Sequence, residues 1–176
     1  MAAGASRRRG ARATSPERRR DRLGTLAAVA GDEQQPIDSA LDWVAEHTRT
    51  YVESGGADGY LWRGFPTLVL TTTGRRSGDL RRNALIFGRD GDDYVLIASY
   101  GGRPKHPLWY LNLVAEPHVR LQDRATVIDG VAETVDEPAE RERLWALMVS
   151  TYPQYADYQA KTDRRIPVVR VRSVAG

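Results

Sequence analysis

The chain has 176 residues, of which 41% are hydrophobic and 28% charged, and it contains no cysteine. This length suits one domain with a hydrophobic core and some additional terminal sequence. Without cysteine there are no disulfides, thiolate metal sites, iron–sulfur clusters or thiol nucleophiles. The histidines, His47, His106 and His118, lack metal-ligand spacing, so we expect no metal site and expect any redox chemistry to depend on an organic cofactor.

The net charge of +3 is distributed unevenly along the chain. Residues 1–22 contain eight Arg against one Glu and one Asp, a net of +6, which leaves residues 23–176 at −3. The segment has almost nothing to bury. We therefore expect a disordered basic tail over residues 1–32 and a folded domain over residues 33–176.

Several roles for this tail stay open. It could be a solvated arm, the product of a start site placed too early, or a contact for anionic lipid or nucleic acid. Arg19 and Arg20 before the apolar run Leu23–Ala30 also resemble a short export signal. We expect no specific nucleic-acid binding, and we expect a cytoplasmic protein, with peripheral contact at the inner face of the cell membrane as an option.

The first predicted element is an amphipathic helix that begins near Pro36. Apolar residues recur at intervals of three and four from Ile37 to Val52, and Ser54-Gly55-Gly56 ends the pattern. Three strands are predicted next, at Thr67–Thr73, Arg81–Gly88 and Asp93–Ser99. The dipeptide Asp90-Gly91 is typical of a tight hairpin turn, so the second and third strands should pair antiparallel.

Helices and strands alternate in the second half. One helix is predicted from Pro107 to Ala115, and another begins at Asp136 and Pro138 and continues imperfectly through three tyrosines. The buried stripe of that second helix is Leu144, Leu147, Met148 and Thr151. The remaining strands are Val119–Gln122, Ala125–Glu133 and Ile166–Val171. Six short strands with mostly hairpin connections predict a mainly β fold with α (α+β), an antiparallel barrel with helices packed outside.

The loop Thr73–Gly78 is the first candidate binding segment. Its glycines let backbone N–H groups turn toward an anion, and Arg75 and Arg76 supply forked donors that match phosphate or carboxylate. Arg81 and Arg82 follow shortly. The loop is therefore a candidate anion site, although a basic hairpin tip is also often simply solvated.

The second candidate runs from Ser99 to Asn112, from a strand end through Gly101-Gly102 into a helix. Unpaired N–H groups at a helix N-terminus favour a phosphate, and the cations Arg103 and Lys105 lie nearby. In the alternative interpretation the helix residues are ordinary core and the cations ordinary surface.

The third candidate is the series Tyr152, Tyr155 and Tyr158. At this spacing the three rings would fall within roughly a 120° arc of one helix. Such a wall with hydroxyls at a wet edge fits both core packing and ligand contact.

Together these segments resemble the deazaflavin (coenzyme F420)-dependent nitroreductase and quinone reductase family. The similarity covers about residues 38–172, and its motifs are Leu70–Gly78, Ala98–Gly102, His106–Leu113 and Tyr152–Gln159. The resemblance implies a split β-barrel of the flavin-reductase-like kind. It also implies that reduced coenzyme F420 passes a hydride to a quinone, a nitro compound or another electron-poor acceptor.

The resemblance also implies residue roles. The cofactor phosphate and acidic tail would be held by Arg75, Arg76, Ser77, Gly78 and Arg81. The residues near the cofactor ring and linker would be Ser99, Tyr100, Gly101, Gly102, Trp109 and Asn112. The acceptor pocket would be lined by Tyr152, Tyr155 and Tyr158. As catalytic hydrogen-bond donors to the acceptor we expect Tyr155 and Tyr158, with Ser99 as a further candidate.

Three positions depart from the family pattern. Ala84 and Ile86 stand where proline and an aromatic residue are common, and Tyr100 stands where lysine is common. Because of these departures, the sequence does not predict which acceptor is the natural one. Two rival functions also remain, a non-catalytic carrier of a deazaflavin or haem-like ligand, and an FMN-dependent oxidase on a related barrel.

Overall fold

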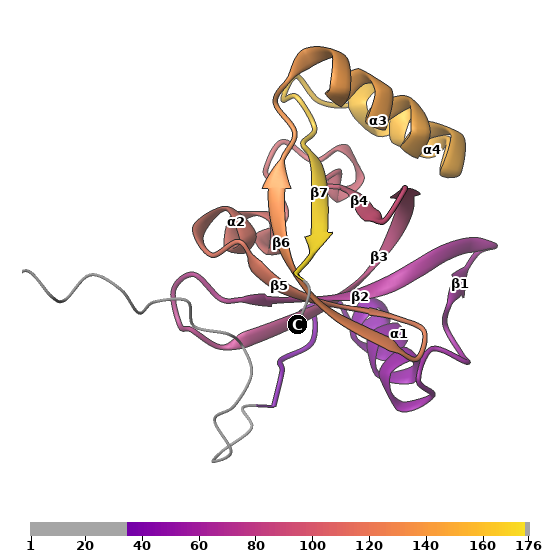
Figure 1. Cartoon of the computed structure of the whole chain (residues 1–176), viewed down its shortest axis with the longest axis vertical. Coiled ribbons are helices and arrows are strands. Elements are labelled where there is room, and N and C mark those ends of the chain that lie inside the picture. Colours follow the sequence, from indigo (N-terminus) through magenta and orange to yellow (C-terminus); the bar gives the residue numbers. More distant parts are fainter. Residues whose placement is uncertain (1–34, 175–176) are drawn as a thin grey trace, which may run out of the picture. The chain divides into compact units, whose positions relative to one another are not determined.

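The computed structural model describes residues 35–174, so the predicted basic tail lies outside the described residues. The strands are β1 (Leu61–Trp62), β2 (Phe65–Thr73), β3 (Leu80–Asp90), β4 (Asp93–Ile97), β5 (His118–Asp123), β6 (Thr126–Thr134) and β7 (Val168–Ser173). Six of them close an antiparallel barrel in the order β2-β3-β4-β7-β6-β5, with β5 pairing back onto β2 (Figure 1). This confirms the predicted barrel, and β1 pairs with β2 as a short hairpin.

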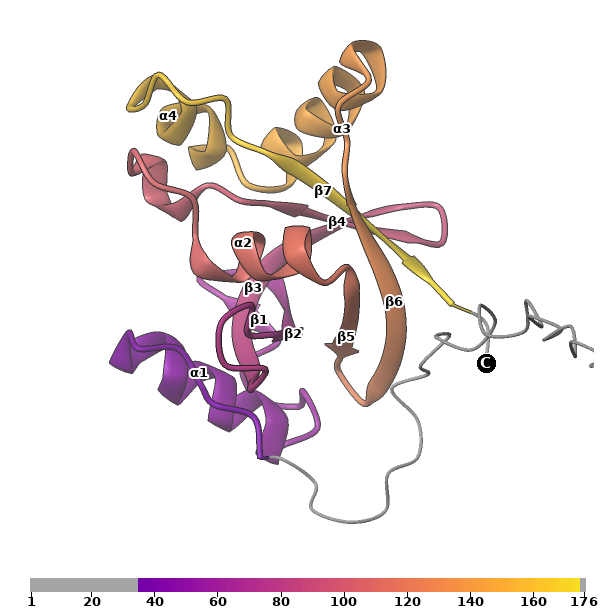
Figure 2. The same ribbon diagram turned by 90° about the vertical axis from the view of Figure 1, so that its left-hand side faces the viewer.

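The helices are α1 (Asp42–Glu53), α2 (Leu108–Ala115), α3 (Pro138–Thr151) and α4 (Gln154–Ala160), with a 3₁₀ turn η1 at Tyr100–Gly102. They lie outside the barrel, with α1 toward one end, α3 and α4 toward the other, and α2 between them (Figure 2). The helices and the barrel therefore form the α+β arrangement that the pattern predicts.

Alternation along the strands divides the core in two. Leu96 of β4 points into the barrel and belongs to its internal cluster, whereas Val95 and Ile97 point outward and pack with Leu144 and Met148 of α3. All five side chains are buried. One face of β4 fills the barrel and the other packs against α3. Both faces are therefore buried, which explains why the sequence of this strand is a run of apolar residues.

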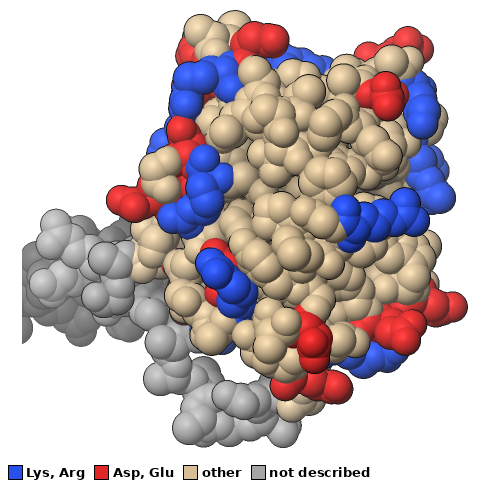
Figure 3. Space-filling model, turned by 90° about the vertical axis from the view of Figure 1, so that its right-hand side faces the viewer, with Lys and Arg blue, Asp and Glu red and all other residues tan. Residues whose placement is uncertain are grey.

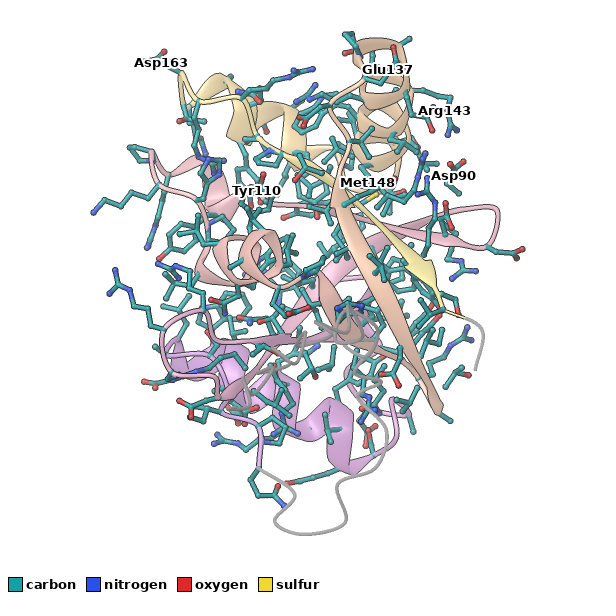
Figure 4. All side chains as sticks on the ribbon, turned by 60° about the vertical axis from the view of Figure 1, so that its left-hand side comes forward. Asp90, Tyr110, Glu137, Arg143, Met148 and Asp163 are labelled. Carbon is teal, nitrogen blue, oxygen red and sulfur yellow. The ribbon has the colours of Figure 1, made fainter. Side chains whose placement is uncertain are left out.

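Helix α3 approaches the barrel closely. A Cβ atom on Gly88 of β3 would come within 2.6 Å of Met148 Sδ, so a larger residue where the helix crosses the strand would force the buried Met148 side chain to move. At the helix start, the Glu137 carboxylate accepts hydrogen bonds from the first free N–H groups. Arg143 faces Asp90 at the β3–β4 turn, with 2.6 Å between Nη2 and Oδ2 (Figure 4).

The predicted start of the first helix is wrong. Helix α1 begins at Asp42, and Ile37 instead forms a bridge with Arg81 of β3. The Ile37 N–H donates to Leu80 O at 2.8 Å, and its carbonyl accepts from Arg82 N at 2.9 Å. Helical spacing in the sequence does not reveal this pairing at a sheet edge, and residues 36–39 are not helical.

The predicted continuation of the second amphipathic helix is also wrong. Helix α3 ends at Thr151, and Tyr152 is extended with φ −139° and ψ 92°. Pro153 explains the break, because a residue before proline is disfavoured in the helical region. A separate helix, α4, then carries Tyr155 and Tyr158. The three tyrosines therefore do not share one helix face.

Candidate functional site

A cavity of about 860 Å³ lies beside the barrel, between β2 and β3 and the helices α1, α2 and α4. It brings together all three candidate segments. The predicted residues that line it are Arg75, Arg76, Ser77, Arg81, Ser99, Tyr100, Gly101, Trp109, Asn112, Tyr152, Tyr155 and Tyr158. Two predicted residues, Gly78 and Gly102, do not line it.

Strand β2 separates two chemically different ends of the cavity. Its nine residues span about 30 Å at roughly 3.3 Å per residue. The first end follows its last residue, where the loop Gly74–Gly78 is closed by Gly74 N to Asp79 O and Gly78 N to Gly74 O, both 2.7 Å. Gly78 adopts φ +78° and so serves the turn itself, which explains its place outside the lining.

The arginines of this cationic end differ in their partners. Arg81 pairs with Asp79 at 3.0 Å, and Arg82 pairs with Asp38 at 2.9 Å. Within the described part of the chain, Arg76 forms no ion pair, and it is exposed at the loop. Arg75 is likewise exposed and without an ion pair in that range, and its Nη1 lies 3.5 Å from Asn112 Oδ1, so Arg75 and Arg76 are the cations whose charges no described carboxylate neutralises.

Asn112 connects this loop to α2. Its side chain is buried; Oδ1 accepts from Arg75 N at 3.2 Å, and Nδ2 donates to Thr72 Oγ1 at 3.2 Å. Trp109, one turn earlier, packs in the barrel cluster while one face lines the cavity. Both residues are therefore part of the core and of the cavity wall.

The loop after β4 forms the middle of the cavity. Tyr100, Gly101 and Gly102 all have positive φ, at 49°, 65° and 78°. Tyr100 is half-exposed, and Arg103 lies over its ring and donates to its hydroxyl at 3.1 Å. Gly102 is buried against α4, where a Cβ atom would come within 2.6 Å of Tyr158 O, so it joins the loop to α4 instead of facing the cavity.

The tyrosines converge at the second end although they lie on two elements. The Tyr152 ring is 5.0 Å from Tyr155 and 6.3 Å from Tyr158. Tyr152 and Tyr158 both donate to Gln154 Oε1. Tyr155 is buried as a residue, but its hydroxyl has no hydrogen-bond partner among residues 35–174 and is not among the buried polar atoms that lack one, so this oxygen is accessible from the cavity that the residue lines.

Burial raises the pKa of two of these tyrosines. It raises the pKa of Tyr155 far above its ordinary value, and burial together with Tyr158 raises the pKa of Tyr152 to about 12. Both hydroxyls therefore keep their protons at neutral pH. Tyr155 is therefore available as a neutral hydrogen-bond donor at the edge of the cavity, whereas Tyr152 already donates to Gln154.

A pair of tryptophans beside the tyrosines was not predicted. Trp43 of α1 stacks on Trp62 of β1 at 5.7 Å, and the Trp62 ring is 6.5 Å from Tyr152. The Arg63 guanidinium lies 4.8 Å above Trp62, at a hairpin turn where Arg63 has φ 52°. Arg63-Gly64 between aromatic residues is a two-residue turn signal that could have revealed this hairpin. The face on the β1 side carries its charges mostly at the margins (Figure 3).

Ala84 and Ile86, the departures on β3, line the cavity, and Ile86 packs against the cluster that contains Tyr152. Their small and aliphatic side chains shape its floor between the two ends. Among residues 35–174 there is no group of three His, Asp or Glu side chains arranged to hold a metal.

Comparison with known proteins points to one family. The family model described as F420H(2)-dependent quinone reductase matches residues 43–173. A Mycobacterium tuberculosis protein named F420H(2)-dependent quinone reductase is 36% identical over 126 residues, covering 70% of this chain and 85% of that protein. A solved structure described as an F420-H2 dependent reductase has a TM-score of 0.57 and 45% identity, covering 61% of this chain and 94% of that one. Another, described as a domain-swapped dimer, has a TM-score of 0.60 and 44% identity, covering 76% and 100%.

Proposed function

The chain belongs to the F420H(2)-dependent quinone reductase family, and from this membership we propose that its cavity binds reduced coenzyme F420 and that the enzyme passes the hydride to a quinone. A nitro compound or another electron-poor acceptor could take the quinone's place. The observation that carries the proposal is the single cavity, which joins a cationic loop at one end to a tyrosine and tryptophan end at the other.

The cationic end fits the acidic part of the cofactor. A phosphate and a carboxylate tail need several cations and free N–H groups, and Arg75, Arg76, Ser77 and Arg81 line this end. The volume of about 860 Å³ lies within the roughly 300–1,000 Å³ of small-molecule sites. We assign these four residues to the phosphate and tail, with Gly78 acting through the turn.

The middle of the cavity fits a flat ring system. Ser99, Tyr100 and Gly101 form one wall, and Trp109 and Asn112 of α2 form another. Bound reduced F420 supplies a hydride, so the work left to these residues is to orient the ring and exclude water. The chain needs no nucleophile, and we propose that it needs no metal.

Tyr155 is the strongest candidate for assisting the acceptor. Negative charge develops on an acceptor oxygen as the hydride arrives, and a buried donor stabilises it strongly. Tyr155 lines the cavity and its O–H has no hydrogen-bond partner among the described residues, whereas the Tyr158 O–H must leave Gln154 before it can donate. We therefore rank Tyr155 first, and Tyr158 and Ser99 after it.

The rival functions differ in their requirement for space. A carrier needs no room beside its ligand, whereas this cavity is also lined by Trp43, Trp62 and Tyr152, in addition to the residues that we assign to the ring. An FMN-dependent oxidase would require affinity for FMN. Family membership favours the F420-dependent enzyme over both.

The decisive experiment is a pair of titrations followed by an assay. The protein is titrated with F420 and, separately, with FMN, and the absorbance and fluorescence of each cofactor are recorded. Oxidation of reduced F420 by the soluble quinone menadione is then measured. We expect saturable F420 binding and quinone-dependent turnover; binding of FMN alone, or F420 binding with no turnover of any acceptor, would contradict the proposal.

We also propose a cytoplasmic location, peripheral contact of the basic tail with anionic membrane, and no specific nucleic-acid partner. None of the helices in the described range is long and apolar enough to cross a membrane. The tail lies outside the described residues, so its charge pattern is what supports this contact.

A further inference from the structure

Arg164 lies in the loop between α4 and β7 and reaches across to the loop that follows β4. Its Nε donates to Arg103 O at 2.8 Å, and its Nη2 donates to Ser99 O at 2.5 Å and to Ala98 O at 3.2 Å. Its Nη1 lies 3.3 Å from His106 Nδ1. One guanidinium therefore holds both the beginning and the end of the segment 99–103.

That segment needs external support. It contains three successive positive φ angles, and a left-handed conformation at the non-glycine Tyr100 is unfavourable unless the surroundings impose it. Its internal backbone hydrogen bonds are Gly102 N to Ser99 O at 3.0 Å and Arg103 N to Tyr100 O at 3.3 Å. The side-chain bonds from Arg164 supply the additional constraint.

The charge of Arg164 is not used for an ion pair in the part of the chain that the structure describes. Burial lowers its pKa, and its neighbour Asp163 points outward from the loop (Figure 4). Its partners are carbonyl oxygens and one histidine. The planar guanidinium of arginine can donate to several carbonyl oxygens at fixed positions, which a lysine ammonium cannot do.

The loop that Arg164 holds carries Ser99, Tyr100 and Gly101 into the cavity, while Tyr155 and Tyr158 enter it from α4. Arg164 itself does not line the cavity. It joins the loop after α4 to the wall assigned to the cofactor ring, and Gly102 packs on the α4 backbone beside it. The relative position of the two walls thus depends on Arg164.

We propose that Arg164 is a positioning residue that sets the distance between the cofactor wall and the acceptor wall during hydride transfer. The inference rests on the proposed function, and it adds a residue that touches neither ligand. Hydride transfer depends steeply on the approach of the reacting atoms, and a displacement of about 1 Å can cost roughly 100-fold in rate.

The test compares Arg164→Lys and Arg164→Met with Arg141→Met. Arg141 is the matched control because it is a buried arginine that donates to Ile166 O at 2.9 Å, near the same loop but outside the cavity. Reduced F420 is mixed with menadione in single-turnover experiments, and the rate constant and the amplitude are recorded separately. A residue needed only for folding lowers the amplitude and the Tm, whereas a positioning residue lowers the rate constant of the molecules that react.

We expect both Arg164 variants to react on the order of 100-fold more slowly at undiminished amplitude, and Arg141→Met to lose Tm while keeping the wild-type rate constant. Amide hydrogen exchange of the cofactor-free protein gives an independent measurement. Exchange at Gly102 and Arg103 should accelerate in Arg164→Met and stay unchanged in Arg141→Met. Wild-type rate constants in both Arg164 variants, or unchanged exchange, would overturn the inference, whereas failure of the wild-type protein to bind F420 would overturn the proposed function instead.

Discussion

The arginines at the cationic end differ in how far nearby carboxylates already neutralise their charges. Arg82 is matched by Asp38 and Arg81 by Asp79, while Arg76 has no ion pair within the described residues. An incoming anion therefore meets the full charge of Arg76 and a partly compensated charge at Arg81. Substitution of Arg76 should therefore affect anion binding more than substitution of Arg81 does.

Arg76→Ala and Arg81→Ala should both weaken F420 binding, with the larger effect at Arg76. Charged hydrogen bonds contribute about 1.5–3 kcal/mol each, and solvent around the exposed loop puts these at the lower end, roughly a tenfold increase in Kd. Fluorescence titration measures the Kd. Arg89→Ala, on β3 but outside the cavity lining, is the control that should bind as wild type. Unchanged affinity in both test variants would remove the loop from the cofactor site.

Tyr155→Phe should slow hydride transfer while leaving F420 affinity nearly unchanged, because only one oxygen is removed. If the Tyr155 hydroxyl stabilises the developing charge, its loss costs about 2.7–4 kcal/mol of barrier, roughly 10²–10³-fold in rate. Tyr158→Phe should cost less, since its hydroxyl already donates to Gln154. Single-turnover rates with menadione and thermal melts of both variants separate the two cases. Lower Tm with an undiminished rate would make the tyrosines structural.

At the scale of elements, the contact between the α4–β7 loop and the β4–α2 loop includes a titratable group. Burial, and then the Arg164 charge, lowers the pKa of His106, whose Nδ1 faces the Arg164 guanidinium. The neutral imidazole accepts a hydrogen bond there, and the protonated form would be repelled. The hydrogen bond between Arg164 and His106, which is part of the contact between the two loops, therefore forms only when His106 is neutral.

Stability should consequently fall as the pH drops below about 6.5, the ordinary histidine value. The lowered folded-state pKa means that the contribution of His106 is fully present above that value and is lost as pH falls through the folded pKa. Asparagine keeps an acceptor without titrating, so the Tm difference between wild type and His106→Asn should narrow or reverse from pH 7.5 to pH 5. Parallel Tm curves for the two proteins would show that His106 does not stabilise these loops.

At the scale of the whole molecule, the barrel and the cavity are built from residues 35–174, and the basic tail lies outside that described range. A chain that begins at Asp32 should fold and reduce menadione at the full-length rate, because residues 35–174 contain the complete barrel and cavity. It should bind vesicles of anionic lipid less than the full chain does, which co-sedimentation measures. Loss of folding on truncation would show that the tail belongs to the domain, and equal vesicle binding would remove its membrane role.

The sequence alone determined the barrel and the chemical identity of its candidate segments. Strand alternation, the Asp90-Gly91 turn and the glycine-arginine loop are local signals, and each is decided by residues close together in the chain. The signal for the helix end after Thr151 was also local, because Pro153 disfavours a helical conformation at the residue before it. The helical spacing of the tyrosines nevertheless led to the prediction of a continuous helix.

Tertiary structure decided which side chains share the cavity and what each one contacts. The edge pairing of Ile37, the stack of Trp43 on Trp62 and the reach of Arg164 to Ser99 each join residues distant in sequence. Periodicity cannot encode such contacts, because they depend on where the closed barrel places its connecting loops. The free hydroxyl of Tyr155 and the bonded one of Tyr158 differ for the same reason: their surroundings, and not their spacing, set the hydrogen bonds that each can make.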